Sequence, residues 1–359
     1  MVGDDMAANH VGLHMIAGVQ QKFIRCLIAA QKPMLAAQLK SRITRWCVRA
    51  YLLPGKLAFR CFPVIFRRLS LGRAYGRHLQ ALVCLYHGRS QSHSTFFLRN
   101  RPELDLMCRL LDRKPAGATA DVVVVACSKG AEVYSIIWKI RSARPDLRLK
   151  VSAVDISQEI VDFAKAGTYS LTDVDPSGAL NCGLIAKTGD LTWKDQILRK
   201  QALSMFGRMT SQEMTGMFDV EGDQAKIKPW LKEGVTWLCR DAADPAFSRP
   251  LGLQDVVVAN RFLCHMEPQA AERCLRNIAR TVRPGGYLFL SGVDLDVRTK
   301  VARDLGWRPI TDMIREVHEG DWSLTEGWPF NYWGLEPFCQ DRPDWKFRYA
   351  SVFQVGSPS

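Results

Sequence analysis

Residues 122–135 read VVVVACSKGAEVYS, and this stretch decides the fold. Its first part, Val122–Val125, is a short run of β-branched residues, which is typical of a buried parallel strand. One apolar helical face follows, formed by Val133, Ile136, Ile137 and Ile140. Ser128 is placed to cap that helix, and Gly130 would let the backbone pass close to a ligand. Strand, tight turn and helix predict the first half of a nucleotide-binding unit.

Three further predicted strands also run into polar residues. Lys150–Val154 leads to Asp155, Val235–Cys239 leads to Asp241, and Asp255–Ala259 leads to Asn260. Ligands of open α/β sheets sit outside the carboxyl ends of the strands, so we expect these side chains to gather there with Ser128. A carboxylate such as Asp155 can accept both hydroxyl donors of a ribose.

A helix over residues 268–282 and a fifth strand over Tyr287–Ser291 complete the predicted module. Strands alternating with helices in this way indicate an α/β fold with a doubly wound, mostly parallel sheet.

Several short segments resemble the CheR-type methyltransferases, which methylate glutamates of chemotaxis receptors with S-adenosylmethionine (SAM). Residues 126–135 resemble their G-C-S-x-G-E-E-P-Y-S segment, and residues 94–99 resemble their T-x-F-F-R segment. Residues 153–157 resemble A-T-D-I-D, and residues 166–169 resemble A-G-x-Y. The resemblance covers about residues 90–295 and implies a class I, Rossmann-like methyltransferase domain with SAM as its cofactor.

The resemblance also implies a role for individual residues. Arg99 would hold the methionine part of SAM, Glu132 its amino end, Asp155 the ribose and Asp241 the adenine. Asn260 would lie near the transferable methyl, so Arg99 and Asn260 are the candidate catalytic residues. The candidate cofactor-binding residues are Thr95, Arg99, Ala126, Ser128, Gly130, Glu132, Asp155, Ile156, Asp241, Ala242, Asn260 and Arg261. The structural alternatives are an ordinary surface role for the arginine and capping or loop-bonding roles for Asp155, Asp241 and Asn260.

The sequence departs from the family pattern mainly on the acceptor side. Ala131 replaces the first Glu of the family's pair, Val133 replaces its Pro, and residues 291–294 replace the usual G-H-S-E. Three functions therefore stay open. The resemblance implies a protein carboxylate as acceptor, the departures favour a small molecule or glycan, and a non-catalytic SAM-binding or scaffold protein is the third.

The chemistry of methyl transfer separates these acceptors. Transfer from a sulfonium is an in-line displacement, so the enzyme mainly aligns the reactants and excludes water. A carboxylate acceptor is already ionised at neutral pH, whereas a hydroxyl or amine needs a general base. The candidate bases are His265, Glu267, Asp294 and the His318-Glu319 pair. His10 and His14 stand at helical spacing without a third ligand nearby, so we expect no metal site.

Charge is distributed very unevenly along the 359 residues. Residues 6–102 contain 16 Lys and Arg and no Asp or Glu, so the first 102 residues carry +14 and the rest −1. An amphipathic helix is predicted from Leu35 to Ala50, ended by Pro54-Gly55. A second stretch, Leu57–Leu69, breaks at Pro63, and a third helix covers Ala74–Tyr86.

This acid-free region is expected to bind an anionic partner, either an acidic protein or an anionic membrane surface. The alternative is a helical cap on the sheet domain with a solvated basic face. Nucleic acid is the less favoured partner, because no aromatic-interleaved nucleic-acid module is present.

Three domains are expected: a basic helical N-terminal domain over residues 1–90, a SAM-binding domain over 91–295 and a C-terminal extension over 296–359. The extension holds five of the ten tryptophans. Its residues Lys346–Val355 alternate as an edge strand would, and residues 328–337 would form a loop beside the sheet. Its aromatics would either cover the core or narrow an acceptor pocket.

The compartment is expected to be the cytoplasm, with peripheral attachment to the inner membrane surface as an option. The eleven cysteines include no C-x-x-C pair, no apolar run reaches about 18 residues, and no leader-like segment is evident.

Overall fold

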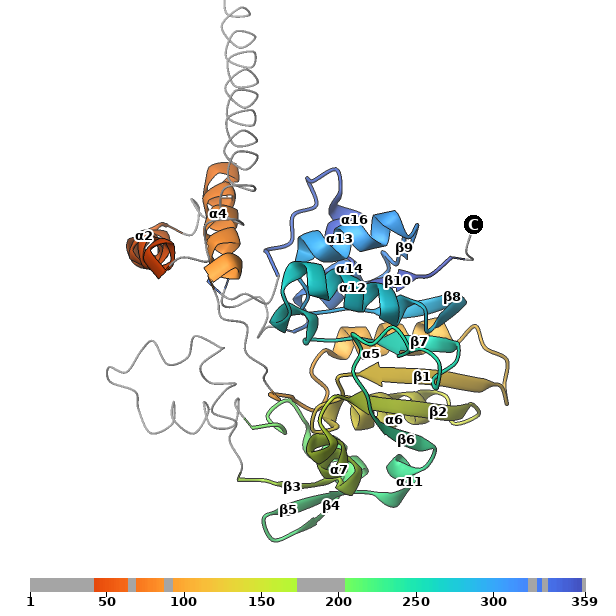
Figure 1. The fold of residues 1–359 in the computed structure, drawn as a ribbon. Coiled ribbons are helices and arrows are strands. Elements are labelled where there is room, and N and C mark those ends of the chain that lie inside the picture. The colour runs from red at the N-terminus through yellow and green to blue at the C-terminus, as the bar shows by residue number, and fades with distance from the viewer. Residues whose placement is uncertain are drawn as a thin grey trace, which may run out of the picture. The chain divides into compact units, whose positions relative to one another are not determined.

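The computed structural model describes residues 42–63, 69–86, 93–172, 204–321, 328–330 and 335–356 (Figure 1). The chain divides into two compact units. A helical unit comprises residues 1–88 and 328–332, and a sheet domain comprises residues 89–327 and 333–359.

A seven-stranded sheet organises the larger unit, with the order β6-β2-β1-β7-β8-β10-β9. Its first five strands in that order are parallel, and β10 is antiparallel to both β8 and β9. The fold class predicted from the sequence, a doubly wound and mostly parallel sheet, is confirmed. The strands are β1 (Thr119–Val125), β2 (Arg148–Asp155), β6 (Val235–Cys239), β7 (Gln254–Val258), β8 (Val282–Phe289), β9 (Arg308–Pro309) and β10 (Val352–Gln354).

Strand β1 lies inside the sheet and separates two hydrophobic cores. Val122 and Val124 belong to one core, while Val123 and Val125 belong to the other, as the period-two geometry of a strand requires. All four valines are at most 1% exposed. A run of β-branched residues therefore satisfies both faces of the sheet at once.

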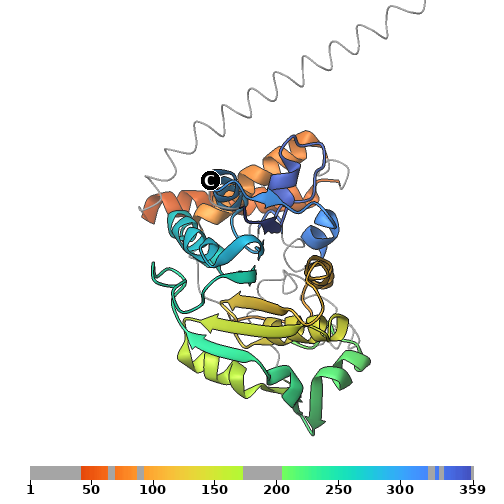
Figure 2. The same cartoon turned by 90° about the vertical axis from the view of Figure 1, so that its right-hand side faces the viewer.

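Helices cover both faces of the sheet (Figure 2). The first core holds residues of α5 (Arg101–Leu111) and α6 (Ala131–Ala143). The second holds residues of α12 (Pro268–Ala279) and α13 (Leu295–Asp304). Helix α7 (Gln158–Ala166) follows β2, capped by the Ser157 side chain, which accepts from the Ile160 N–H.

A smaller sheet that was not predicted from the sequence has the strand order β3-β5-β4, and its strands are antiparallel. Its core is an aromatic cluster in which Phe97 meets Tyr169, Phe206 and Phe218 at centroid distances of 5.0–5.4 Å. The elements of this part are β3 (Thr168–Ser170), α10 (Ser211–Met217), β4 (Phe218–Glu221), β5 (Gln224–Ile227) and α11 (Pro229–Lys232).

The predicted C-terminal edge strand is partly wrong. Residues Trp345–Tyr349 form helix α16, and only Val352–Gln354 form a strand. That strand, β10, lies between β8 and the two-residue β9, so β9 is the edge. Two short helices come before α16: the 3-10 helix η2 (Leu263–His265) and α14 (Ile314–Glu319).

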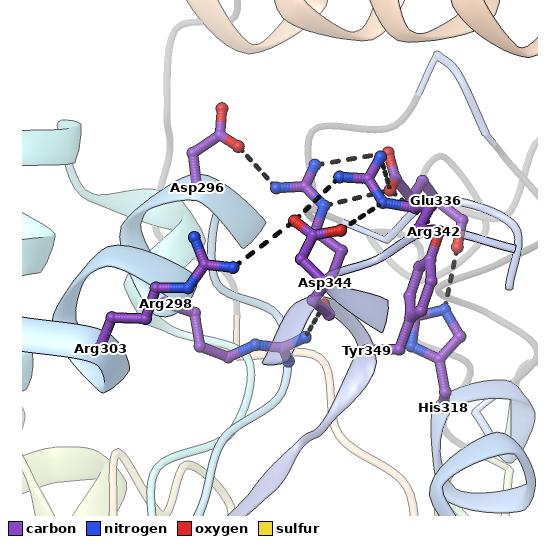
Figure 3. Close-up of polar contacts among 9 residues, drawn as sticks. Asp296, Arg298, Arg303, His318, Glu336, Arg342, Asp344 and Tyr349 are labelled. Carbon is purple, nitrogen blue, oxygen red and sulfur yellow. Dashed lines mark hydrogen bonds and ion pairs between the residues drawn. The ribbon is translucent and has the colours of Figure 1, made fainter. Parts of the chain in front are cut away.

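A cluster of charged side chains explains why residues 345–349 are helical (Figure 3). Arg348 donates to both oxygens of Glu336, at 3.1 and 3.4 Å, and to Asp296 at 2.5 Å. The Tyr349 hydroxyl donates to the same Glu336 at 3.1 Å, and Arg342 lies 3.5 Å from it. A strand would send Arg348 and Tyr349 to opposite faces, whereas this helix brings both to one carboxylate.

The helical unit consists of α2 (Arg42–Cys61) and α4 (Ser70–Tyr86), with Trp328–Phe330 packed on them. Phe59 makes edge contacts with Trp328 and Phe330 at 5.7 and 6.0 Å. Of the predicted loop over residues 328–337, residues 328–330 thus belong to this unit, whereas residues 335–337 belong to the sheet domain.

The predicted helix end at Pro54-Gly55 is wrong, since α2 runs through both residues to Cys61. Gly55 is buried where α2 approaches α4, and a Cβ there would lie 3.0 Å from Leu79 Cδ2. Packing therefore overrides the helix-breaking propensity of proline and glycine. The predicted break at Pro63 agrees with the end of α2, and the helix over Ala74–Tyr86 is present as α4.

Candidate functional site

A cavity of about 350 Å³ lies at the carboxyl ends of β1, β2, β6 and β7. Every predicted cofactor-binding residue except Gly130 lines it: Thr95, Arg99, Ala126, Ser128, Glu132, Asp155, Ile156, Asp241, Ala242, Asn260 and Arg261. Polar side chains that follow four different strands therefore converge on one cavity, as the topology of an open α/β sheet requires.

Asp155, the last residue of β2, is held in place by two backbone donors. Its Oδ2 accepts from the Ser128 N–H at 2.9 Å, and its Oδ1 accepts from the Ser157 N–H at 3.2 Å. The residue is only 5% exposed and lines the cavity. Both bonds fix the orientation of the carboxylate before any ligand binds.

The prediction that Ser128 caps α6 is wrong. Its hydroxyl donates to the His93 carbonyl at 2.9 Å, and the N-cap residue is Gly130, which makes no side-chain cap bond. Gly130 has φ 84°, and a Cβ there would lie 3.0 Å from Ala164 Cβ in α7. Helix packing accounts for this glycine, which does not line the cavity.

Arg99 supplies a positive charge at the cavity. Its Nη2 donates to the Ser94 carbonyl at 3.1 Å, its guanidinium lies 5.8 Å from the centre of the Phe96 ring, and its buried Nε has no partner. Burial, together with nearby Arg261, lowers the pKa of Arg99 to about 10, so it stays protonated at neutral pH. A buried donor without a partner is costly, and an anionic ligand would satisfy it.

Asn260 bridges two carboxyl groups. Its Nδ2 donates to Glu103 Oε1 and to Glu132 Oε1, each at 2.8 Å. Its Oδ1 accepts from the Ser291 N–H at 2.8 Å and from the Ser291 hydroxyl at 2.9 Å. Because a backbone N–H can only donate, Ser291 fixes the amide orientation, and both amide hydrogens are used inside the protein.

Glu103 is the site residue that sequence reasoning misses. It lies in the first turn of α5, is 4% exposed, and its buried Oε2 has no hydrogen-bond partner. Burial, and then the nearby Glu132, raise the pKa of Glu103 to about 8. An acid in a first helical turn is common, so the available signal was its place in the sequence as the first acid after Asp5.

Asp321 closes the charged side of the site. It is 3% exposed and pairs with Arg208 at 3.1 Å and with Arg261 at 2.8 Å. A Cβ on Gly292 would lie 2.7 Å from Arg261 Cα. The glycine in segment 291–294, where the sequence departs from the family pattern, therefore permits the close approach of the Arg261 backbone.

The part of the lining that follows β6 and β7 also contains apolar residues, namely Ala242, Phe262, Met266 and Cys274, together with Arg240 and His265. Asp241 Oδ1 accepts from the Ala243 N–H at 2.8 Å, so this residue makes the capping bond of the structural alternative while also lining the cavity.

Of the candidate bases, His265 lines the cavity, whereas Glu267, Asp294, His318 and Glu319 do not. His318 lies in the C-terminal cluster, where its Nε2 is 2.9 Å from the Glu336 carbonyl oxygen (Figure 3). Burial lowers the pKa of His318 to about 4, so it is neutral there.

Within the described ranges, no group of three or more His, Cys, Asp or Glu residues could hold a metal ion. His10 and His14 lie outside those ranges. Among the helices that the structure describes, none is both long and apolar enough to cross a membrane.

Comparisons with known proteins find matches to methyltransferases over the sheet domain. The family model for "CheR methyltransferase, SAM binding domain" matches residues 93–181, and the model for "Methyltransferase domain" matches residues 196–290. "Chemotaxis protein methyltransferase 1" of Vibrio cholerae is 24% identical over 223 residues, which cover 60% of this chain and 69% of the relative.

An "Uncharacterized 104.1 kDa protein in hypE 3'region" of Rhodobacter capsulatus is 24% identical over 196 residues, or 53% of this chain. The match spans only 17% of that relative's length. The N-methyltransferase NodS of Bradyrhizobium japonicum, solved with S-adenosylhomocysteine, is 13% identical with a TM-score of 0.30. That match covers 58% of this chain and 76% of NodS, and the likeness is too distant to bear on function.

The expected resemblance to CheR-type methyltransferases is confirmed by the family model and by the chemotaxis methyltransferases among the relatives. The matched segments are methyltransferase domains, so a SAM-dependent methyltransferase class and SAM as cofactor are also confirmed for the sheet domain. None of these matches fixes the methyl acceptor.

Proposed function

We propose that this chain transfers a methyl group from SAM to a carboxylate oxygen of a protein. The observation that carries the proposal is the cavity lining, which offers Asp155 for the ribose and opposite charges, Arg99 and Glu132, for the two ends of an amino acid. SAM is a nucleoside joined to an amino acid, so both features fit the same ligand.

Individual residues would bind SAM as the resemblance implies. Asp155, fixed by two backbone N–H groups, would accept the ribose hydroxyls, and Arg99 would donate to the methionine carboxylate through its unpartnered Nε. Asp241 and the apolar lining would flank the adenine. SAM supplies an electrophilic methyl, so the protein's contribution is alignment and exclusion of water.

Asn260 would act as a positioning residue, because both of its amide hydrogens already hold Glu103 and Glu132. It therefore has no donor left for the acceptor. This differs from the catalytic role that the resemblance implies. A positioning role predicts that Asn260→Asp mainly lowers the affinity for SAM, whereas a catalytic role predicts that it mainly lowers turnover.

The carboxylate acceptor is favoured by the likeness to CheR-type and chemotaxis methyltransferases. Among the candidate bases within the described residues, His265 alone lines the cavity, so it is the residue at which this choice can be tested. His265→Ala is expected to change turnover less than threefold for a carboxylate acceptor. A hydroxyl or amine acceptor would instead lose on the order of 10²–10⁴ in rate.

The direct experiment uses SAM labelled in its methyl group, incubated with cell protein and with small metabolites. Esters release labelled methanol in mild base, whereas ethers and N-methyl groups do not. Base-labile label in the protein fraction would support the proposal. Base-stable label in the metabolite fraction would favour a small-molecule or glycan acceptor, and no transfer despite SAM binding would favour a scaffold.

We also propose a cytoplasmic location in which the helical unit binds an anionic membrane surface. Helix α2 has an exposed apolar row opposite its buried face. Trp46, Leu53 and Leu57 are 71%, 67% and 60% exposed, whereas Leu52 and Phe59 are buried. Trp46 and Leu53 also line a groove of about 660 Å³ with Arg49 and Lys56.

An apolar row containing tryptophan beside cations suits the lipid headgroup region, and acid-free α2 and α4 offer no internal counter-charge. Vesicles with and without anionic lipid test this. Binding to anionic vesicles should fall when salt rises and when Trp46 and Leu53 become Ser. Binding to an acidic protein instead, or coverage of the row by the chain itself, would contradict the membrane proposal.

A further inference from the structure

We propose that Glu103 joins Glu132 in a paired-carboxyl site for the ammonium group of the cofactor's amino-acid end, with Asn260 as the bridge that holds the pair together. The inference rests on SAM binding in the cavity described above. It adds a residue that neither the sequence motifs nor the comparisons point to.

The geometry comes first. One amide nitrogen, Asn260 Nδ2, lies 2.8 Å from an oxygen of each carboxyl group, so the two carboxyls are held close together. Each uses its Oε1 for this bond, and Oε2 of Glu103 is buried without a partner. Glu103, Glu132, Arg99 and Asp321 line a water-sized side cavity of about 20 Å³.

The carboxyls that line the side cavity outnumber its cations. Asp321 pairs with Arg208 and Arg261, which lie outside that lining, at 3.1 and 2.8 Å. Arg99 is then the remaining cation among the residues that line the side cavity, against the two carboxyls of Glu103 and Glu132. The buried Glu103 carboxyl lies close to the partly buried Glu132, so it does not ionise readily and keeps its proton until an external positive charge arrives.

The expected consequence is that Glu103 loses its proton when the cofactor binds. Before the cofactor binds, Glu103 holds a proton at neutral pH, because burial, Glu132 and Asp321 raise its pKa to about 8 while Asn260 and Arg99 oppose that rise. An ammonium group placed between the carboxyls favours the ionised form. Cofactor binding should therefore release a proton, and the affinity should rise as the pH approaches 8.

The experiment is calorimetry of S-adenosylhomocysteine binding to the full chain in buffers with different ionisation enthalpies, at pH 6 to 8.5. We expect release of about one proton near pH 7. Glu103→Gln should release none, and it should lose about tenfold in affinity at pH 8.5 but less than threefold at pH 6.

Two comparisons keep the outcome clear. Glu213→Gln is the matched control, because Arg101 lowers the pKa of that buried carboxyl to about 2 and it does not titrate in this range. 5′-Methylthioadenosine, which lacks the amino-acid end, should bind the unaltered protein without proton release, and this readout needs no variant to fold.

The outcomes separate the two proposals. If S-adenosylhomocysteine does not bind the unaltered protein at all, the proposed function fails. If it binds without proton release and Glu103→Gln binds equally well at every pH, the paired-carboxyl site is overturned while the proposed function stands.

Discussion

Glu103 and Glu336 are two buried glutamates of the sheet domain with opposite surroundings. Glu336 is 6% exposed, and each of its carboxyl oxygens accepts a hydrogen bond, from Arg348 and from Tyr349. Glu103 is 4% exposed and receives a single side-chain bond, from Asn260. One carboxylate is saturated by the chain itself, and the other has an oxygen to spare beside the cavity.

The difference distinguishes a structural ion cluster from a ligand site. A buried carboxylate with enough cationic donors stays ionised and ties segments together, as Glu336 ties α16 to the segment before it. A buried carboxylate without a cationic donor keeps its proton and is poised to receive a ligand. Each prediction below tests one side of this contrast.

Glu336→Gln is expected to have the largest effect. It leaves the partly buried Arg348 and Arg342 beside a neutral group with one carboxylate partner each, Asp296 and Asp344, which should lower the free energy of unfolding by about 3 kcal/mol. Urea denaturation measures this. Glu272→Gln is the control, because Glu272 pairs with the more exposed Arg276 and Lys300, and a loss of about 1 kcal/mol or less is expected there. The affinity of the folded variant for S-adenosylhomocysteine should be unchanged, and a large loss of affinity would undo the contrast.

Asp155→Ala is expected to reduce binding without unfolding the chain. Loss of a charge-assisted contact to two hydroxyls should cost about 2–3 kcal/mol of binding free energy for SAM and S-adenosylhomocysteine. Asp162→Ala, on the exposed side of α7, serves as the matched control. Undiminished affinity in calorimetry would remove Asp155 from the binding site.

The pH dependence of the free energy of unfolding should reveal the titration of Glu103 in the cofactor-free protein. Its pKa is about 8 in the folded state and near 4.5 when unfolded, so the folded state holds the proton more tightly. The stabilisation is complete below about pH 4.5 and is lost as the pH rises through about 8. Between pH 6 and 8 the unaltered protein should lose about 2 kcal/mol relative to Glu103→Gln. Parallel stability curves for the two proteins would show that Glu103 is ionised throughout.

Arg99→Lys should have the smallest effect of the four. It keeps the charge but loses the Nε–H donor and the planar fork, so we expect about a tenfold loss of affinity for S-adenosylhomocysteine, or about 1.4 kcal/mol. Affinity for 5′-methylthioadenosine should not change. Equal losses for both ligands would mean that Arg99 acts through the fold and not on the amino-acid end.

Features that depend on a few neighbouring residues could be predicted from the sequence. The β-branched run at Val122 and the acid after Val154 identify β1, β2 and a carboxylate at the cavity, because each signal lies within a few residues. The pairing of Glu103 with Asn260 joins positions 157 residues apart, and no spacing rule connects them. Glu103 becomes buried beside Glu132 only once α5 and α6 have packed together, so the pair cannot be found from the sequence alone.

The errors in the helical unit and at the C-terminus have the same origin. Pro54-Gly55 reads as a helix end, but Gly55 is needed where α2 and α4 approach closely. Lys346 to Tyr349 alternate like a strand, but a single carboxylate at Glu336 gathers Arg348 and Tyr349 from one helical turn. In both places a tertiary contact outweighs a weak local preference.

The placement of Trp328–Phe330 in the helical unit governs how the chain can be cut. The chain leaves that unit at residue 88 and re-enters it at 328–332, so the unit is assembled from two separate pieces of sequence. Cleavage between residues 86 and 93 would leave the N-terminal fragment held by packing such as that of Phe59 on Trp328 and Phe330. Deleting residues 1–88 would strip an aromatic segment of its cover, so truncation is a poor way to isolate the sheet domain. The two fragments, expressed separately, should instead recombine when mixed.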